Sequence, residues 1–168
     1  MKIAVVRAKE RGETDRLISE TAAFLLAQGV NLAGIVKVLG EDDDANQCRE
    51  MAVQVLPDGA VIAITQDLGE GSDACKLDPG AIAQAVAEVE RQPIENVQLF
   101  ILNKFGPQEA DGRGFRDAIA TALAAGIPVL VGVGGSSRAG FDAFVDGLAE
   151  TLPSDAGAIR DWCLKAMA

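Results

Sequence analysis

The residues with the clearest chemical potential lie near the N-terminus, between a short apolar run and a helical pattern. Residues 7–14, RAKERGET, fit the phosphate-binding loop pattern G-x-x-x-x-G-K-[ST] at Gly12 and Thr14. Arg7 replaces the first glycine of that pattern, and Glu13 replaces its lysine. The lysine normally reaches the β- and γ-phosphates, so Glu13 would set a negative charge against a polyphosphate. The sequence therefore predicts that this loop disfavours ordinary ATP binding.

The same loop carries its own positive charges. Arg7, Lys9 and Arg11 alternate along it and would supply cations to an anion held by the N–H groups of a helix N-terminus. The alternative is that they are solvated loop charges, which are common on protein surfaces. Gly-x-Thr before a helix also describes an ordinary helix start, where Glu13 would favour the helix dipole. Considered by itself, this loop is better explained as an ordinary helix start, while both interpretations of its basic side chains stay open.

A second polar segment follows the apolar run 97–102. Asn103 and Lys104 come directly after it, where phosphate-loop enzymes carry the acids that serve magnesium and the attacking group. The loop GPQEADGRGFR comes next. In it, Arg113 is the candidate for binding an oxyanion through its forked guanidinium group, and Glu109 is the candidate base or metal-linked acid. The alternative is that Asp111 caps a helix and that the glycines serve tight turns.

Two further loops contain glycine and nucleophilic side chains. Residues 66–81, QDLGEGSDACKLDPGA, offer Ser72 and Cys75 to an oxyanion, and Cys75 beside Lys76 is the best candidate for a reactive thiol. Packing beneath the loop is an equally good interpretation of Cys75. Residues 132–140, GVGGSSRAG, would wrap a ligand with backbone N–H groups, although they lack the dinucleotide fingerprint and an N-cap serine explains them more simply.

Composition narrows the chemistry. The chain has 168 residues, no histidine, no tyrosine and a formal net charge of -10. Histidine-based triads and metal sites are excluded, and the acidity argues against nucleic-acid partners and anionic membrane surfaces. No apolar run approaches the roughly 20 residues of a membrane span, so we expect a cytoplasmic protein without membrane insertion. The three cysteines are expected to be reduced, and no metal site is predicted.

Apolar runs rich in β-formers alternate with segments of helical period, which predicts one α/β domain over residues 1–168 with a mostly parallel sheet in a three-layer sandwich. The turn Leu56-Pro57-Asp58-Gly59-Ala60 predicts a hairpin over 51–64. The other expected strands are residues 3–6, 32–39, 97–102 and 129–133. Helical faces are expected over 17–25, from Asp78-Pro79 to 89, over 115–123 and 141–148, and around 159–163, where Cys163 shares an apolar face with Ile159 and Trp162.

Four stretches carry a family resemblance: LLAQGVNLAGIV, QDLGEGSDACKLDPGAI, NKFGPQEADGRGFRDAI and AAGIPVLVGV. Together they make almost the whole chain similar to the uncharacterised bacterial domain-of-unknown-function family 2478. The strand and loop from 97 to 130 also resemble the DEIGKMEL stretch of the thermophilic-type nucleoside triphosphatases. The resemblance implies a P-loop NTPase-like fold, and the family's link to molybdate transport loci implies a role in molybdenum handling without naming a reaction.

The resemblance also implies where the site residues have changed. Asn103 stands in place of the magnesium-associated aspartate, Lys104 in place of the catalytic glutamate, and Glu13 in place of the loop lysine. The two charges are thus exchanged across the site, and we expect Glu13 and Lys104 to form an ion pair at the carboxyl edge of the sheet. Such a site would retain the anion-binding backbone and lose hydrolysis.

The leading hypothesis is therefore a non-hydrolysing binding or regulatory protein that recognises molybdate, another oxyanion or a nucleotide. Its partners would be a molybdate transporter or molybdenum-cofactor proteins. One alternative is a metal-dependent nucleotide or phosphate-ester hydrolase using Lys104 and Glu109. A second is a ligand-free interaction protein for a transporter ATPase or a cofactor-assembly enzyme. The candidate ligand-binding residues are Lys9, Arg11, Gly12, Glu13, Thr14, Ser72, Cys75, Asn103, Lys104 and Arg113.

Overall fold

A computed structural model describes residues 1–40, 51–66 and 76–168 of the chain. Its main sheet has the strand order β4-β3-β2-β7-β8-β1-β9. The strands are β1 (Ile3–Val6), β2 (Leu32–Lys37), β3 (Ala52–Val55), β4 (Val61–Ala63), β7 (Leu99–Phe105), β8 (Val129–Val133) and β9 (Glu150–Leu152). A small separate pair joins β5 (Thr65–Gln66) to β6 (Lys76–Leu77). Neighbours from β2 through β7, β8 and β1 to β9 run parallel, and β3 and β4 add an antiparallel edge.

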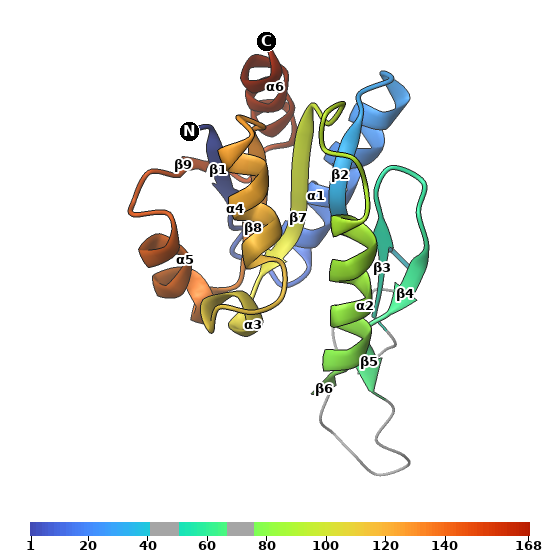
Figure 1. The fold of residues 1–168 in the computed structure, drawn as a ribbon. Helices are drawn as coiled ribbons and strands as arrows, with labels where there is room; N and C mark the ends of the chain where they lie inside the picture. The colour runs from blue at the N-terminus through green and yellow to red at the C-terminus, as the bar shows by residue number, and fades with distance from the viewer. Residues whose placement is uncertain (41–50, 67–75) are drawn as a thin grey trace.

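Helices cover both faces of this sheet, as Figure 1 shows. They are α1 (Glu13–Ala27), α2 (Pro79–Glu90), α3 (Pro107–Ala110), α4 (Arg116–Ala124), α5 (Arg138–Phe144) and α6 (Ala156–Met167), with a short 3₁₀ turn, η1 (Gly135–Ser137). Leu17 of α1 and Ile159 of α6 belong to one apolar cluster, whereas Ile82 of α2 and Ile119 of α4 belong to the cluster on the other face. The three-layer α/β sandwich with a mostly parallel sheet is confirmed.

Local sequence signals explain several element boundaries. Asp78 accepts hydrogen bonds from the N–H groups of Gly80 and Ala81, and Pro79 opens α2, as expected of an N-cap followed by proline. The predicted hairpin is present, since β3 and β4 pair antiparallel around the Pro57-containing turn. Gly29, at a φ of 77°, follows the end of α1.

Two boundaries differ from the prediction in ways that matter for the site. Strand β7 runs to Phe105, so Asn103 and Lys104 lie within the strand rather than after it. Its register with β8 shifts between Leu102 and Phe105, and such an irregularity re-aims side chains near the end of a strand. Strand β9, a three-residue edge strand that pairs with β1, was not expected from the sequence.

Cys163 lies in the core, as its place on an apolar helical face predicted. Cys163 is fully buried on α6, and burial raises the pKa of its thiol to about 12. Among the described residues, no helix is both long enough and apolar enough to cross a membrane.

Candidate anion-binding site

The loop after β1 borders a pocket of about 260 Å³ at the carboxyl edge of the sheet. Strand β1 lies beside β8, and β8 lies beside β7, so the ends of these three parallel strands meet there. This is the edge at which open α/β sheets bind ligands. Its lining residues are Arg7, Ala8, Lys9, Glu10, Arg11, Gly12, Thr14, Asp15, Lys104, Val133, Gly134 and Gly135. We call this the basic pocket.

The N-terminus of α1 forms one wall of the basic pocket. Gly12 precedes the helix at a φ of 80°, and no side chain among the described residues caps this end. The N–H of Arg16 donates to the carbonyl of Gly12, which closes the first helical turn. Because a helix leaves its first N–H groups without intrahelical partners, this end of a 15-residue helix can accept an anion.

Hydrogen bonds hold the shape of the loop. The N–H of Ala8 donates to the Thr14 hydroxyl oxygen at 2.9 Å, so the two ends of the loop are tied together. The Ser154 hydroxyl donates to the carbonyl of Arg7 at 3.2 Å and joins the loop to the segment after β9. Thr14, predicted from the loop pattern, therefore has a structural bond as well as a place in the pocket lining.

Two basic side chains lie against the glycines that follow β8. A Cβ atom added to Gly135 would stand 3.1 Å from Nη2 of Arg7, and one added to Gly134 would stand 3.0 Å from Cε of Lys104. Glycine at these positions therefore gives both cations room beside the backbone. Lys9 and Arg11 also line the pocket, so the predicted residues Lys9, Arg11, Gly12, Thr14 and Lys104 come together there.

Asn103 meets the loop through a residue that the sequence analysis did not single out. Its side-chain amide donates to Oδ1 of Asp15 at 3.1 Å, and Asn103 is itself buried. Asp15 lines the basic pocket, directly after Thr14. Its place in the first turn of α1 was a sequence signal for proximity to this edge of the sheet, although Glu13 in the same turn points to Arg16 instead.

The expected ion pair between Glu13 and Lys104 is wrong. The Glu13 carboxylate pairs with Arg16 on the same helix, with a shortest oxygen–nitrogen distance of 2.6 Å, and this lowers the pKa of Glu13. Glu13 is not among the residues that line the basic pocket. A side chain in the first helical turn reaches its neighbour three residues on more readily than a strand across the pocket. No ion pair of Lys104 occurs within the described residues.

Glu109 is buried and has a structural role in its loop. Its two carboxylate oxygens accept the N–H of Gly106 at 2.9 Å and the N–H of Phe115 at 3.1 Å. Burial raises the pKa of this carboxyl, and the two hydrogen bonds partly offset that rise. Asp111, considered as the cap of the helix that follows this loop, instead lies at the C-terminal end of α3, and Phe115 precedes α4. The carboxylate that secures this loop is that of Glu109.

The remaining candidates do not join the basic pocket. Arg113 has a side chain that is 68% exposed, and its guanidinium lies 3.6 Å from Asp111 rather than in the pocket lining. Ser72 and Cys75 fall outside the described residues. No cluster of three or more acidic or cysteine side chains that would hold a metal ion occurs in the part of the chain that the structure describes.

Comparison with known proteins adds a family. The model for a protein family described as "Protein of unknown function (DUF2478)" matches residues 3–162. The chain belongs to the DUF2478 family. This membership, expected from the sequence resemblance, is confirmed, and it covers the loop after β1 as well as β7 and β8.

One curated relative and one solved structure are informative about this DUF2478 chain. It is 35% identical over 161 residues to the molybdenum import ATP-binding protein ModC 2 of Bradyrhizobium diazoefficiens, which covers 96% of the chain and only 18% of that relative. A human cancer-related nucleoside triphosphatase solved in solution is similar with a TM-score of 0.57 at 14% identity, over 89% of this chain and 86% of that one. The predicted P-loop NTPase-like fold is confirmed.

Proposed function

We propose that this DUF2478 protein is a non-hydrolysing receptor for a tetrahedral oxyanion, either molybdate or the phosphate of a nucleotide, in the handling of molybdenum. The observation that carries the proposal is the basic pocket at the start of α1. Its volume of about 260 Å³ is large enough for a compact anion.

The charge of the pocket supports an anionic ligand. The whole chain has a formal charge of -10, yet the pocket lining contains the basic residues Arg7, Lys9, Arg11 and Lys104 against the acids Glu10 and Asp15. A local excess of cations on an acidic protein attracts small anions without attracting nucleic acid or anionic membranes. Arginine adds planar donors suited to oxyanions.

The groups on β7 support binding without hydrolysis. Phosphoryl transfer in this class of fold relies on carboxylates that hold magnesium and on a group that orients the nucleophile. Here Asn103 presents an amide that already donates to Asp15, and Lys104 presents an ammonium. An ammonium attracts an oxyanion and repels a metal ion, so the site favours retention of the anion over metal-assisted attack.

The molybdenum part of the proposal comes from the relative. A segment similar to nearly all of this chain forms 18% of a longer polypeptide named for molybdenum import and ATP binding. A module joined to a transport protein is well placed to sense the transported anion or the nucleotide that drives transport. We infer the same association for this chain, with a molybdate transporter or molybdenum-cofactor protein as its partner.

The test is a ligand titration of the purified full chain with molybdate, tungstate, sulfate, ATP and GTP, followed by thermal unfolding and by calorimetry. A ligand of the native state raises apparent stability by about 2.7 kcal/mol at a hundredfold excess over Kd. We expect molybdate or a nucleotide to give such a stabilisation. The absence of stabilisation by every anion would overturn the proposal.

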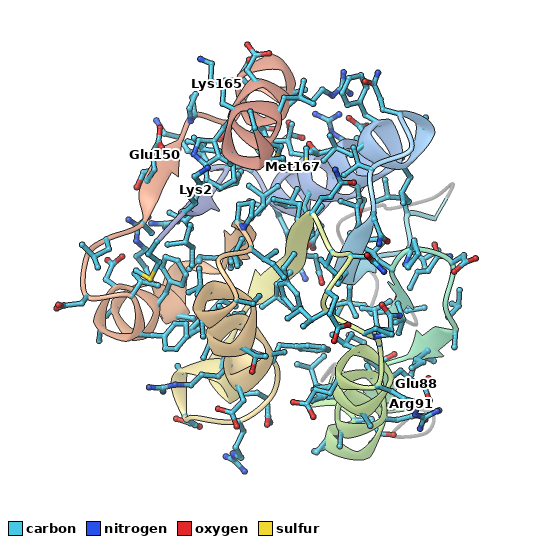
Figure 2. The ribbon with its side chains drawn as sticks, turned by 45° about the horizontal axis from the view of Figure 1, so that its top comes forward. Lys2, Glu88, Arg91, Glu150, Lys165 and Met167 are labelled. Atoms are coloured by element: carbon cyan, nitrogen blue, oxygen red, sulfur yellow. The ribbon has the colours of Figure 1, made fainter. Side chains whose placement is uncertain are left out.

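Two variants localise the effect. Lys104→Ala should weaken binding about tenfold or more, because it removes one charged contact worth roughly 1.5–3 kcal/mol. Arg91→Ala is the matched control, since Arg91 is paired with Glu88 near the end of α2, where Figure 2 labels both. Arg91 is not part of the basic pocket, so its replacement should leave the affinity unchanged.

The hydrolase alternative has a separate readout. Release of phosphate from ATP or GTP with magnesium, lost in Lys104→Ala, would show that the site is catalytic and would contradict a non-hydrolysing role. The buried bonding of Glu109 to Gly106 and Phe115 argues against its use as a base.

A further inference from the structure

A second pocket, of about 280 Å³, lies beside the basic pocket on the face covered by α2. Two residues, Asp15 and Lys104, line both pockets. Its lining combines apolar side chains of β2, β3 and α2 with residues of the segment after β7. We call this the apolar pocket, and nothing in the proposed function uses it.

The walls of the apolar pocket come from several elements of the sheet and its cover. Ile35 and Val53 contribute from neighbouring strands, Ile82 and Ala85 from α2, and Phe115 from the start of α4. These five side chains are buried and form the inner wall of the pocket, whereas Leu77 of β6, which also lines it, is 40% exposed. A pocket with aliphatic and aromatic walls and a few polar groups is the usual form of a site for a small organic molecule.

The polar groups of the apolar pocket lie at its junction with the basic pocket. Asp15 and Lys104 belong to both linings, and Asn103, which donates to Asp15 at 3.1 Å, lines the apolar pocket beside them. One end of a bound molecule could thus be held by cations and the α1 N-terminus while its body rests on apolar side chains. An inorganic oxyanion bound in the basic pocket would leave the apolar pocket filled with water.

We propose, building on the proposed function, that the two pockets form one bipartite site for a phosphorylated small molecule with a compact aromatic or apolar body. The phosphate occupies the basic pocket and the body occupies the apolar pocket. This assigns the ligand to the class of organic phosphate esters instead of free inorganic oxyanions. Burial of the body supplies affinity that an inorganic anion cannot gain.

Calorimetry with three probes tests the assignment: inorganic phosphate, phenyl phosphate and 1-naphthyl phosphate, each titrated into the full chain. We expect phenyl phosphate to bind more tightly than inorganic phosphate, and 1-naphthyl phosphate to bind at least about tenfold more tightly. Lys104→Ala should weaken all three probes. Equal affinities for the three probes would overturn the inference while leaving the proposed oxyanion site intact, whereas no binding of any anion, molybdate included, would overturn both.

Two Leu→Asp variants test whether the body of the ligand occupies the apolar pocket. Leu77, 40% exposed in β6, lines the apolar pocket, and Leu148, 64% exposed, does not. Leu77→Asp should remove the preference for 1-naphthyl phosphate and leave the affinity for inorganic phosphate within about twofold, while Leu148→Asp should change neither. A preference that survives Leu77→Asp would overturn the inference.

A second variant keeps the test decisive if Leu77→Asp fails to fold. Gln108, which is half-buried in the lining, can be replaced by tryptophan to narrow the apolar pocket. Gln108→Trp should reduce the preference for the naphthyl ester and leave inorganic phosphate binding unchanged. Retention of the full preference in a folded Gln108→Trp protein would likewise overturn the inference.

Discussion

Two glycine-containing loops emerge at the same edge of the sheet, and they use their charges in opposite ways. The loop over residues 7–12 directs basic side chains and a helix N-terminus toward a pocket. The loop over residues 106–115 closes on the buried carboxylate of Glu109, whose oxygens both accept backbone N–H groups. The first loop thus presents basic side chains to a pocket, whereas the second uses its carboxylate to hold its own backbone.

The glycines of the two loops should differ most in their tolerance of a side chain. Gly114 and Gly12 both have positive φ, but a Cβ on Gly114 would clash with Oε1 of Glu109, whereas Gly12 has open space. Gly114→Ala should cost roughly 2–5 kcal/mol, since it adds left-handed strain to a lost hydrogen bond. Gly12→Ala should cost only about 1–2 kcal/mol. Urea unfolding measures both, and equal losses would remove the distinction between the loops.

The buried carboxylate should leave a signature in the pH dependence of stability. Burial raises the pKa of Glu109 in the folded protein, so the folded state holds this proton more tightly than the unfolded chain does. The contribution of Glu109 to stability is then complete below the ordinary carboxyl pKa of about 4.3 and is lost as pH rises through the raised folded value. Removal of the titrating group by Glu109→Gln should remove that slope.

The measurement for Glu109 is the free energy of unfolding of wild type and of Glu109→Gln from about pH 4 to pH 7. The variant should be less stable by about 1–3 kcal/mol at the acidic end, because its amide cannot accept both N–H groups. The difference should shrink toward neutral pH. A difference that grows with pH would mean that the carboxylate is stabilised in the fold, contrary to its raised pKa.

Arg7 and Arg113, one from each loop, should differ in how much they contribute to ligand affinity. Arg7 lies beside Gly135 in the basic pocket, and Arg113 is exposed next to Asp111. Arg7→Ala should weaken molybdate or phosphate binding about tenfold, equivalent to about 1.4 kcal/mol. Arg113→Ala should leave the Kd within about twofold. Calorimetry that found a loss of affinity in Arg113→Ala would restore the oxyanion role predicted for it from sequence.

The smallest effect is expected from divalent cations. The sequence resemblance predicts that Asn103 and Lys104 replace a magnesium-associated aspartate and a catalytic glutamate, and the structure shows Asp15 bonded to Asn103. Addition of magnesium or of EDTA should therefore change the Kd for the oxyanion by less than about twofold. Strong magnesium dependence in the same titration would indicate a nucleotide site of the hydrolytic kind.

Most of the fold could be predicted from the sequence, because the patterns that mark its helices and strands are local. Asp78-Pro79 marks the start of α2, the Pro57-containing turn marks the hairpin, and the apolar runs mark the central strands. The edge strand β9 was missed because Glu150–Leu152 has neither the length nor the alternation of a typical strand. It is a strand because it pairs with β1, and a local pattern does not reveal that pairing.

The candidate site could be predicted only in part from the sequence. The phosphate-loop pattern and the strand ends were enough to place Thr14 and Lys104 in one pocket. The pattern could not reveal that Glu13 prefers Arg16 as a partner, because the choice depends on the direction in which each side chain leaves its element. Nor could it reveal that Glu109 is saturated by backbone donors, which depends on the path of the chain between 106 and 115.

The bond between the N–H of Ala8 and the Thr14 hydroxyl has a kinetic consequence. Because this bond already holds the loop in shape before a ligand arrives, little conformational entropy is lost when the ligand binds. The encounter should then be governed by diffusion and by attraction between charges, with an association rate that falls as ionic strength rises. Thr14→Val, which removes the acceptor, should slow capture more than it speeds escape.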